Sequence, residues 1–107
     1  MIEVSIAKDF TRYPSGRYKQ NGSTSGEGFR ERFLESPLSA GEIVTVDFDG
    51  TVGYGSSFLE EAFGGLVRSL KKPGSFFDEH LKLKSSDPSI CEEVQEYIRD
   101  AAKLLNL

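Results

Sequence analysis

The sequence predicts a small α/β domain in which three strands alternate with three helices in the order βαβαβα. Apolar and polar residues alternate at residues 2–8 and 80–85, and β-branched residues dominate residues 42–49, which is typical of strands. Each segment is followed by apolar residues that recur every three or four positions, as in helices. Right-handed connections then give a sheet with helices packed on it. At 107 residues the chain has the length of one domain, so we expect a single domain over residues 1–107.

A long polar segment separates the first strand from the first helix. Residues 11–24 are rich in Gly, Pro, Ser and Asn, which predicts a loop. Thr24 and Glu27 have the spacing of a capping box, so we expect the helix to begin there. Pro37 predicts its end. The apolar side of this helix comprises Phe29, Phe33 and Leu34.

The second strand leads into the second helix through a glycine-rich turn. We expect this helix to begin near Ser57 and to end at Lys72-Pro73-Gly74. Its predicted buried stripe comprises Leu59, Ala62, Phe63, Leu66, Val67 and Leu70. The residues expected away from this stripe are Glu60, Glu61, Arg68 and Lys71. Gly64 and Gly65 each lower helix stability by about 1 kcal/mol relative to alanine, which predicts close packing here, most simply on the sheet of the domain itself.

The third strand and the last helix complete the pattern. Phe76 and Phe77, before the strand, fit either a turn of helix or a loop that packs on the core. Ser86 or Asp87 caps the last helix, and Pro88 occupies its first turn, where the missing N–H costs nothing. The predicted buried stripe of this helix comprises Ile90, Val94, Tyr97, Ile98, Ala101 and Leu105.

Composition and charge argue against several classes of function. A formal net charge of −4 disfavours binding to nucleic acid. No apolar run approaches the ~20 residues of a membrane span, and the start of the chain does not read as a signal peptide, so we expect a cytoplasmic protein without membrane contact. The single cysteine, Cys91, cannot form an internal disulfide and is expected to pack as a small hydrophobe. His80 has no second His or Cys at ligand spacing, so we expect no metal site and no cofactor.

The segment Asp47-Phe48-Asp49-Gly50-Thr51 follows the second strand, at the edge where sites lie in open α/β sheets. It resembles the nucleophile loop of haloacid dehalogenase-type phosphatases. That resemblance implies a small magnesium-dependent phosphotransfer enzyme, in which Asp47 attacks phosphorus and Asp49 protonates the leaving group. Such enzymes need a later Ser or Thr, a Lys and a further acidic pair, for which the remaining chain offers only Ser85-Ser86-Asp87 and Asp78-Glu79. This enzyme is the alternative hypothesis, and its competitor is a structural, hydrogen-bonding role for both carboxylates.

A second resemblance covers nearly the whole chain. The chain is similar to the bacterial STAS-like domain of unknown function, in which three of its elements recur at similar spacing: Gly16-Arg17-Tyr18, Ser25-Gly26-Glu27-Gly28-Phe29-Arg30 and Gly53 to Leu66. It is distantly similar to STAS anti-sigma-factor antagonists, which also place a Ser-Ser pair between a strand and an apolar helix. The resemblance implies a STAS-like fold and a non-enzymatic regulatory module that binds a protein partner. The partner that it implies is a histidine-kinase-like ATPase.

The antagonist resemblance places a phosphorylated serine on Ser57. A phosphate there would face free N–H groups and the positive end of the helix dipole. Two positions depart from the antagonist pattern, because Gly55 replaces its aspartate and Phe58 replaces its glycine. In the alternative interpretation, Ser57 and Glu60 form a capping box and Phe58 packs over Tyr54 as a hydrophobic staple. The predicted partner contacts are Tyr54, Gly55, Ser56, Phe58 and Glu61.

The polar loop offers a separate candidate site. Arg12, Arg17 and Lys19 alternate with two tyrosines, and guanidinium groups bind phosphate in a bidentate manner. We predict that these three cations bind an anion, a nucleotide or an acidic partner. The alternative is a solvated loop whose tyrosines lie on the core.

Overall fold

The computed structural model describes all 107 residues and confirms an α/β fold. Three parallel strands form one sheet in the order β1-β2-β3, namely β1 (Ile2–Ser5), β2 (Val44–Asp47) and β3 (Leu81–Lys84). They pair in register, with Ile2 opposite Val44 and Val44 opposite Leu81. Each strand is shorter than the sequence pattern predicts, and the alternating burial of β2 matches a sheet with one covered face.

The first strand ends early because Ser5 starts a helical turn, η1 (Ile6–Phe10). The Ser5 hydroxyl accepts a hydrogen bond from the Lys8 N–H at 3.2 Å, and the Asp9 carboxylate accepts one from the Ser5 N–H at 2.7 Å. These two bonds cap the turn from both sides. The predicted strand over residues 2–8 is therefore wrong beyond Ser5.

Residues 26–39 form one continuous helical segment, made of α1 (Gly26–Phe29), the π-helical turn η3 (Arg30–Leu34) and α2 (Glu35–Ser39). A short 3-10 turn, η2 (Lys19–Asn21), lies in the loop before it. Ser25, and not Thr24, caps the segment, because its hydroxyl accepts from the Gly28 N–H at 3.1 Å. Pro37 does not end the helix as predicted. It lies inside α2, and the helix ends two residues later, at Ser39.

A second continuous helical segment covers residues 56–70, with α3 (Ser56–Leu59), η4 (Glu60–Gly64) and α4 (Gly65–Leu70). Lys71 ends it in the left-handed conformation, at φ 55°. The predicted apolar stripe is confirmed, since its residues are buried apart from the half-buried Leu70. Glu61 is the exception to the pattern. It was expected on the outer side but is 7% exposed.

The remaining elements are α5 (Gly74–His80), which contains Phe76 and Phe77 in a helix, and α6 (Pro88–Leu104). Asp87 caps α6, because its carboxylate accepts from the Ser89 N–H at 3.0 Å, as the sequence allowed. Leu105 lies beyond the last helical residue and is exposed, so its predicted burial is wrong. No helix has the length and apolarity that a membrane crossing requires.

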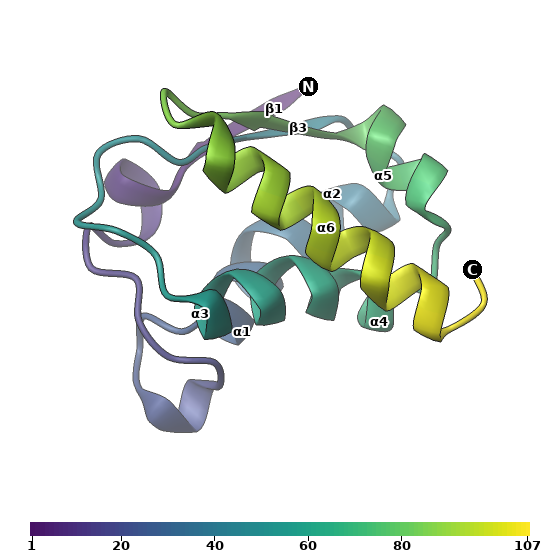
Figure 1. Cartoon of the computed structure of the whole chain (residues 1–107). Helices are drawn as coiled ribbons and strands as arrows, with labels where there is room; N and C mark the ends of the chain where they lie inside the picture. The colour runs from purple at the N-terminus through teal and green to yellow at the C-terminus, as the bar shows by residue number, and fades with distance from the viewer.

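The helices gather on one face of the sheet, as Figure 1 shows. The strand order in space equals the order in the chain, so two right-handed crossovers place both connections on the same side. The core lies between the two layers and is rich in phenylalanine. The rings of Phe29, Phe48, Phe58 and Phe63 are linked by centroid distances of 5.6–6.4 Å. The opposite face of the sheet carries exposed or half-buried polar side chains, namely Glu3, Ser5, Thr45, Asp47, Lys82 and Lys84.

Candidate functional site

The turn between β2 and α3, taken with the first two residues of α3, covers residues 48–57 and lies at the carboxyl end of the sheet. We call it the β2–α3 turn. Gly50 and Gly53 have φ angles of 99° and 139°, which few other residues adopt. The Val52 N–H donates to the carbonyl of Arg12 at 2.9 Å, so the turn is attached to the loop after η1.

Tyr54 closes the base of this turn. Its hydroxyl donates to the carbonyl of Phe48 at 2.6 Å, and its ring contacts those of Phe48 and Phe58 at centroid distances of 5.6 and 6.0 Å. Burial raises the pKa of Tyr54 to about 12. The hydroxyl therefore stays protonated and continues to donate at neutral pH. The half-buried Tyr54 therefore stabilises the turn, and only part of its side chain is exposed at the surface.

The two serines that open α3 are exposed, and their hydroxyls form no hydrogen bond within the chain. Gly55 is the N-cap residue, so no side chain satisfies the first N–H groups of the helix. The predicted capping box of Ser57 and Glu60 is wrong. Ser57 lies inside the helix, and the Glu60 carboxylate binds Arg17 and Arg68 instead.

Two predicted partner contacts lie inside the protein. Phe58 is 0% exposed and packs between Tyr54 and Phe29, so the staple interpretation of this residue is confirmed. Glu61 is 7% exposed and forms an ion pair with Arg30. Neither side chain can meet a partner in this conformation, which corrects both predictions. Gly55 and Ser56 remain at the surface.

Glu60 and Glu61 form an ionic cluster with three arginines, and the sequence pattern did not reveal it. Arg30 donates to the Glu61 carboxylate at 2.9 Å from the neighbouring helical segment. Arg17 donates to Glu60 at 2.5 Å, and Arg68 donates to both oxygens of Glu60 at 2.8 and 3.0 Å. The pKa of Glu60 lies below its usual value, chiefly because Arg68 donates a hydrogen bond to its carboxylate. Arg30 also contacts Glu35.

The paired glycines of the second helical segment make room for this cluster. A Cβ atom at Gly65 would lie 2.9 Å from both the Arg30 Nε and a carboxylate oxygen of Glu61. A Cβ atom at Gly64 would lie 2.3 Å from a carboxylate oxygen of Glu60. The predicted close packing is present, but charged side chains rather than the sheet occupy the space. In the sequence, the Ser25-to-Arg30 element and the glycine pair are the features that could have pointed to this ionic cluster.

Two of the three cations of the candidate anion site, which comprises Arg12, Arg17 and Lys19, already pair with carboxylates. Arg17 is bound to Glu60, and Lys19 pairs with Glu31 at 2.6 Å. Only Arg12 forms no ion pair. Because two of the three positive charges are already neutralised, an incoming anion would have to displace carboxylates that lie within hydrogen-bonding distance.

Asp47 and Asp49 have structural partners. Asp47 accepts from the Asp49 N–H at 2.9 Å, which folds the start of the turn. Asp49 accepts hydrogen bonds from the N–H and hydroxyl of Ser86 at 2.9 and 3.0 Å. The bond from the Ser86 N–H is the main reason that the pKa of Asp49 lies below its usual value. These bonds connect the β2–α3 turn to the loop before α6. No three His, Cys, Asp or Glu side chains converge in a metal-binding arrangement.

Comparison with known proteins agrees with this geometry. A family model described as a STAS-like domain of unknown function matches residues 25–90. That range begins at the Ser25 cap, includes the ionic cluster except Arg17 and the whole β2–α3 turn, and ends in α6. Neither a curated protein nor a solved structure matches the chain significantly.

Proposed function

We propose, from the premise that this chain belongs to the family of STAS-like domains of unknown function, that it is a regulatory protein-interaction module. The proposed docking surface is the β2–α3 turn, and the proposed control is phosphorylation of Ser57. The proposed partner is a protein kinase of the histidine-kinase-like ATPase type, which the resemblance to anti-sigma-factor antagonists implies. The module itself catalyses no reaction in this proposal.

The observation that carries the proposal is the state of the Ser57 hydroxyl. It is exposed, it bonds to nothing in the chain, and it lies at a helix start that no side chain caps. A hydroxyl that capped the helix would be protected from a kinase and needed for stability. Ser57 has neither constraint. A phosphate on it would gain the unpaired N–H groups of α3 as hydrogen-bond donors.

The β2–α3 turn and the loop bound to it each carry one exposed apolar side chain. Val52 is 74% exposed, and Tyr13 is 65% exposed on the loop that the Val52 N–H binds through Arg12. Exposed apolar side chains next to a polar rim are typical of interaction sites. A phosphate with a charge of about −1.5 to −2 next to this surface would change the partner that fits it.

The ionic cluster reduces the repulsion that a phosphate on Ser57 would meet from neighbouring carboxylates. Ser57 precedes Glu60 and Glu61 by one helical turn, so these carboxylates are its neighbours on the helix. Both already pair with arginines. A phosphate would therefore meet carboxylates whose charge is largely compensated.

The phosphotransfer alternative has no comparable support. The carboxylates of Asp47 and Asp49 accept hydrogen bonds that hold two loops together. No cationic side chain is directed at them within ion-pair distance.

The test combines phosphorylation and capture. The purified chain is incubated with native-host lysate and ATP, and phosphate is located by mass spectrometry in the wild type, Ser57→Ala and Ser69→Ala. Ser69 is the matched control, because it is an exposed serine near the opposite end of the same helical segment. We expect incorporation in the wild type and Ser69→Ala and none in Ser57→Ala.

The second arm identifies the partner. An ATPase captured by the wild type and by Ser69→Glu, but not by Ser57→Glu, would support the proposal. Equal capture by all three, with no phosphate on Ser57, would contradict it.

A further inference from the structure

The outer edge of β3 is free. The Phe48 N–H donates to the carbonyl of Lys84 at 2.9 Å, so Lys84 directs its backbone groups to β2. Successive residues of a strand direct these groups to opposite sides, so the N–H and C=O of Leu83 point outward. The Leu81 carbonyl points the same way, whereas its N–H is bound to the carbonyl of Phe77. β3 therefore presents unpaired donors and acceptors at the border of the sheet.

The other border of the sheet differs. On β1, the outward N–H of Ser5 is bound by the Asp9 carboxylate at 2.7 Å, and the chain then turns into η1. Such a turn shortens and covers an edge strand. On β3, by contrast, no side chain binds the outward N–H or C=O of Leu83. The backbone groups of Glu3 also point outward from β1 without a partner, so β1 keeps a free stretch, but a shorter one than β3.

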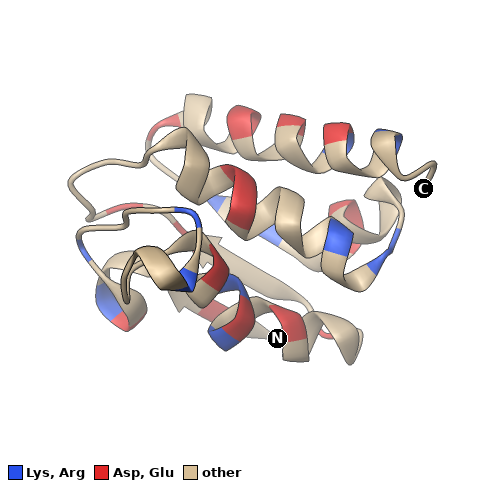
Figure 2. Ribbon diagram, turned by 90° about the horizontal axis from the view of Figure 1, so that it is seen from below, with Lys and Arg blue, Asp and Glu red and all other residues tan.

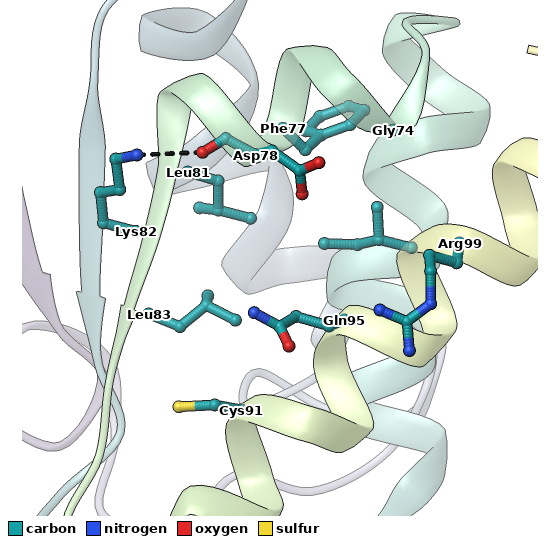
Figure 3. A pocket seen from close by; sticks show the side chains of 10 residues that line it. Gly74, Phe77, Asp78, Leu81, Lys82, Leu83, Cys91, Gln95 and Arg99 are labelled. Atoms are coloured by element: carbon teal, nitrogen blue, oxygen red, sulfur yellow. Dashed lines mark hydrogen bonds between the residues drawn. The ribbon is translucent and has the colours of Figure 1, made fainter.

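A groove runs beside this free edge, between β3, α5 and α6. It holds about 340 Å³, and its apolar lining comprises Phe77, Leu81, Leu83, Cys91 and Ile98. Figure 3 shows Leu83 and Gln95 facing each other across it, with Cys91 and Arg99 also projecting from α6. The pKa of the Cys91 thiol is raised, chiefly by burial, so this side chain is an uncharged part of the groove lining. A groove between an edge strand and a helix is suited to an extended peptide.

The charges around the groove select the kind of peptide. Lys82 and Lys84 are exposed on the face of β3 opposite to Leu81 and Leu83, where Lys84 pairs with Glu3 at 3.7 Å and Lys82 forms no ion pair. Arg99 lines the groove and forms no ion pair, and Asp78 is the one acidic side chain in the lining. A strand added to β3 would place alternate side chains against the leucines and against the lysines. Apolar residues fit the first set of positions and acidic residues fit the second.

We propose that β3 binds an extended segment of a partner protein in which apolar and acidic residues alternate. The segment adds a fourth strand to the sheet, and its apolar side chains enter the groove between β3 and α6. This site is separate from the β2–α3 turn and does not depend on Ser57.

A second copy of this chain is a poorer occupant. Pairing of β3 with the β3 of another copy would bring Lys82 and Lys84 against the same lysines, and like charges that face each other destabilise a strand pair. Pairing with the β1 of another copy would displace the Asp9 bond to Ser5. It would also be head-to-tail and would leave a new open β3 edge each time.

The test uses a labelled peptide of alternating Val and Glu and the full chain, with binding followed by fluorescence anisotropy. The first control peptide alternates Val and Lys. The second has the Val-Glu sequence with methylated backbone nitrogens, which cannot form the strand ladder. We expect binding of the Val-Glu peptide alone. Equal binding of the methylated peptide would overturn the proposal, as would no binding of the Val-Glu peptide.

Two chain variants locate the site. Lys82→Glu reverses a charge on the face of β3 that the acidic side chains of the peptide would meet, and Lys103→Glu makes the same change on α6, outside the groove lining. We expect Lys82→Glu to weaken binding at least about fivefold and Lys103→Glu to change it little, since charge reversal matters most at the contact. Equal effects of the two variants would overturn the proposed location.

Hydrogen exchange and sedimentation give readouts independent of the label. The Leu83 amide should exchange more slowly when the Val-Glu peptide is bound, because it then donates to the added strand. Unchanged exchange at Leu83 would overturn the strand addition. Concentration-dependent oligomers of the chain alone, disrupted by Lys82→Glu, would show that a second copy is the occupant and would overturn the peptide proposal.

Discussion

Two regions on the same helical segment use polar residues in opposite ways. At Glu60 and Glu61, each carboxylate is bound by arginines and is partly or fully withdrawn from water. One turn earlier, the hydroxyls of Ser56 and Ser57 are exposed and bonded to nothing. The first region connects three parts of the chain, whereas the second contributes nothing to holding the fold. The contrast separates polar residues that build the domain from those that are free to be modified.

Breaking the ionic cluster should have the largest effect on stability. We expect Arg30→Met to lower the free energy of unfolding by about 3–5 kcal/mol, because it leaves the carboxylate of Glu61 buried without its nearest partner. Urea unfolding measures the loss. The double variant Arg30→Met with Glu61→Met should recover part of it, because the uncompensated buried charge is gone. A loss under about 1 kcal/mol in the single variant would contradict the structural role of the cluster.

The contact between the two helical segments should be the next most sensitive. A Cβ atom on Gly26 would lie 2.3 Å from the carbonyl oxygen of Phe58, a backbone atom that cannot rotate away. We expect Gly26→Ala to cost about 1–3 kcal/mol. Gly74→Ala is the control, since a Cβ there meets no atom within 4 Å. It should be neutral or stabilising by up to about 1 kcal/mol, and equal losses in both variants would show that the close approach is not the cause.

The pair of serines at the two helix starts gives a matched comparison. The hydroxyl of Ser25 is buried and accepts the Gly28 N–H at 3.1 Å, so Ser25→Ala should cost about 1 kcal/mol. Ser57→Ala should stay within about 0.5 kcal/mol of the wild type. Thermal unfolding of both variants under one condition measures the difference. Equal losses would mean that Ser57 has a structural partner after all.

Acid should test the Glu60 side of the cluster through a smaller effect. The folded-state pKa of Glu60 lies below its ordinary value, chiefly because Arg68 binds it. Its contribution to stability is therefore present above the ordinary pKa of glutamate and is lost as the pH falls through the lowered folded-state pKa. The difference in urea midpoint between wild type and Glu60→Gln should shrink from pH 7 to pH 3. A constant difference would contradict this linkage.

The sequence was sufficient for the parts of the fold that local patterns determine. Alternation and period predict all three strands and the apolar stripe of the second helical segment, and local residue preferences narrow the cap of α6 to Ser86 or Asp87. It placed the boundaries less well. Thr24 and Ser25 are both good caps with acceptable spacing, and the choice depends on the packing of Gly26 against Phe58, which lies far along the chain.

The candidate site was harder to predict because periodicity treats charged residues as exposed. Glu61 was placed on the outer side for that reason, yet Arg30, 31 positions earlier in the chain, makes its burial favourable. The sequence predicts Phe58 as a surface contact because it lies at the first turn of the helix, before the continuous apolar stripe begins. The exposed state of Ser57 could not be derived either, since its spacing to Glu60 is that of a capping box.

The strand order β1-β2-β3 repeats the order in which the ribosome makes the chain. Each new strand pairs with the strand made just before it, and no strand waits for a partner that has not been synthesised. The sheet can therefore grow from one side as the chain emerges, although each pairing joins segments that lie far apart in the chain and must wait for the whole crossover to be made. Acidic residues follow along α6, the last helix (Figure 2), and this helix covers the core only after β3 has joined the sheet. Until α6 is made, the nascent domain would expose the apolar side of its newest strand, which makes its synthesis the step that completes folding.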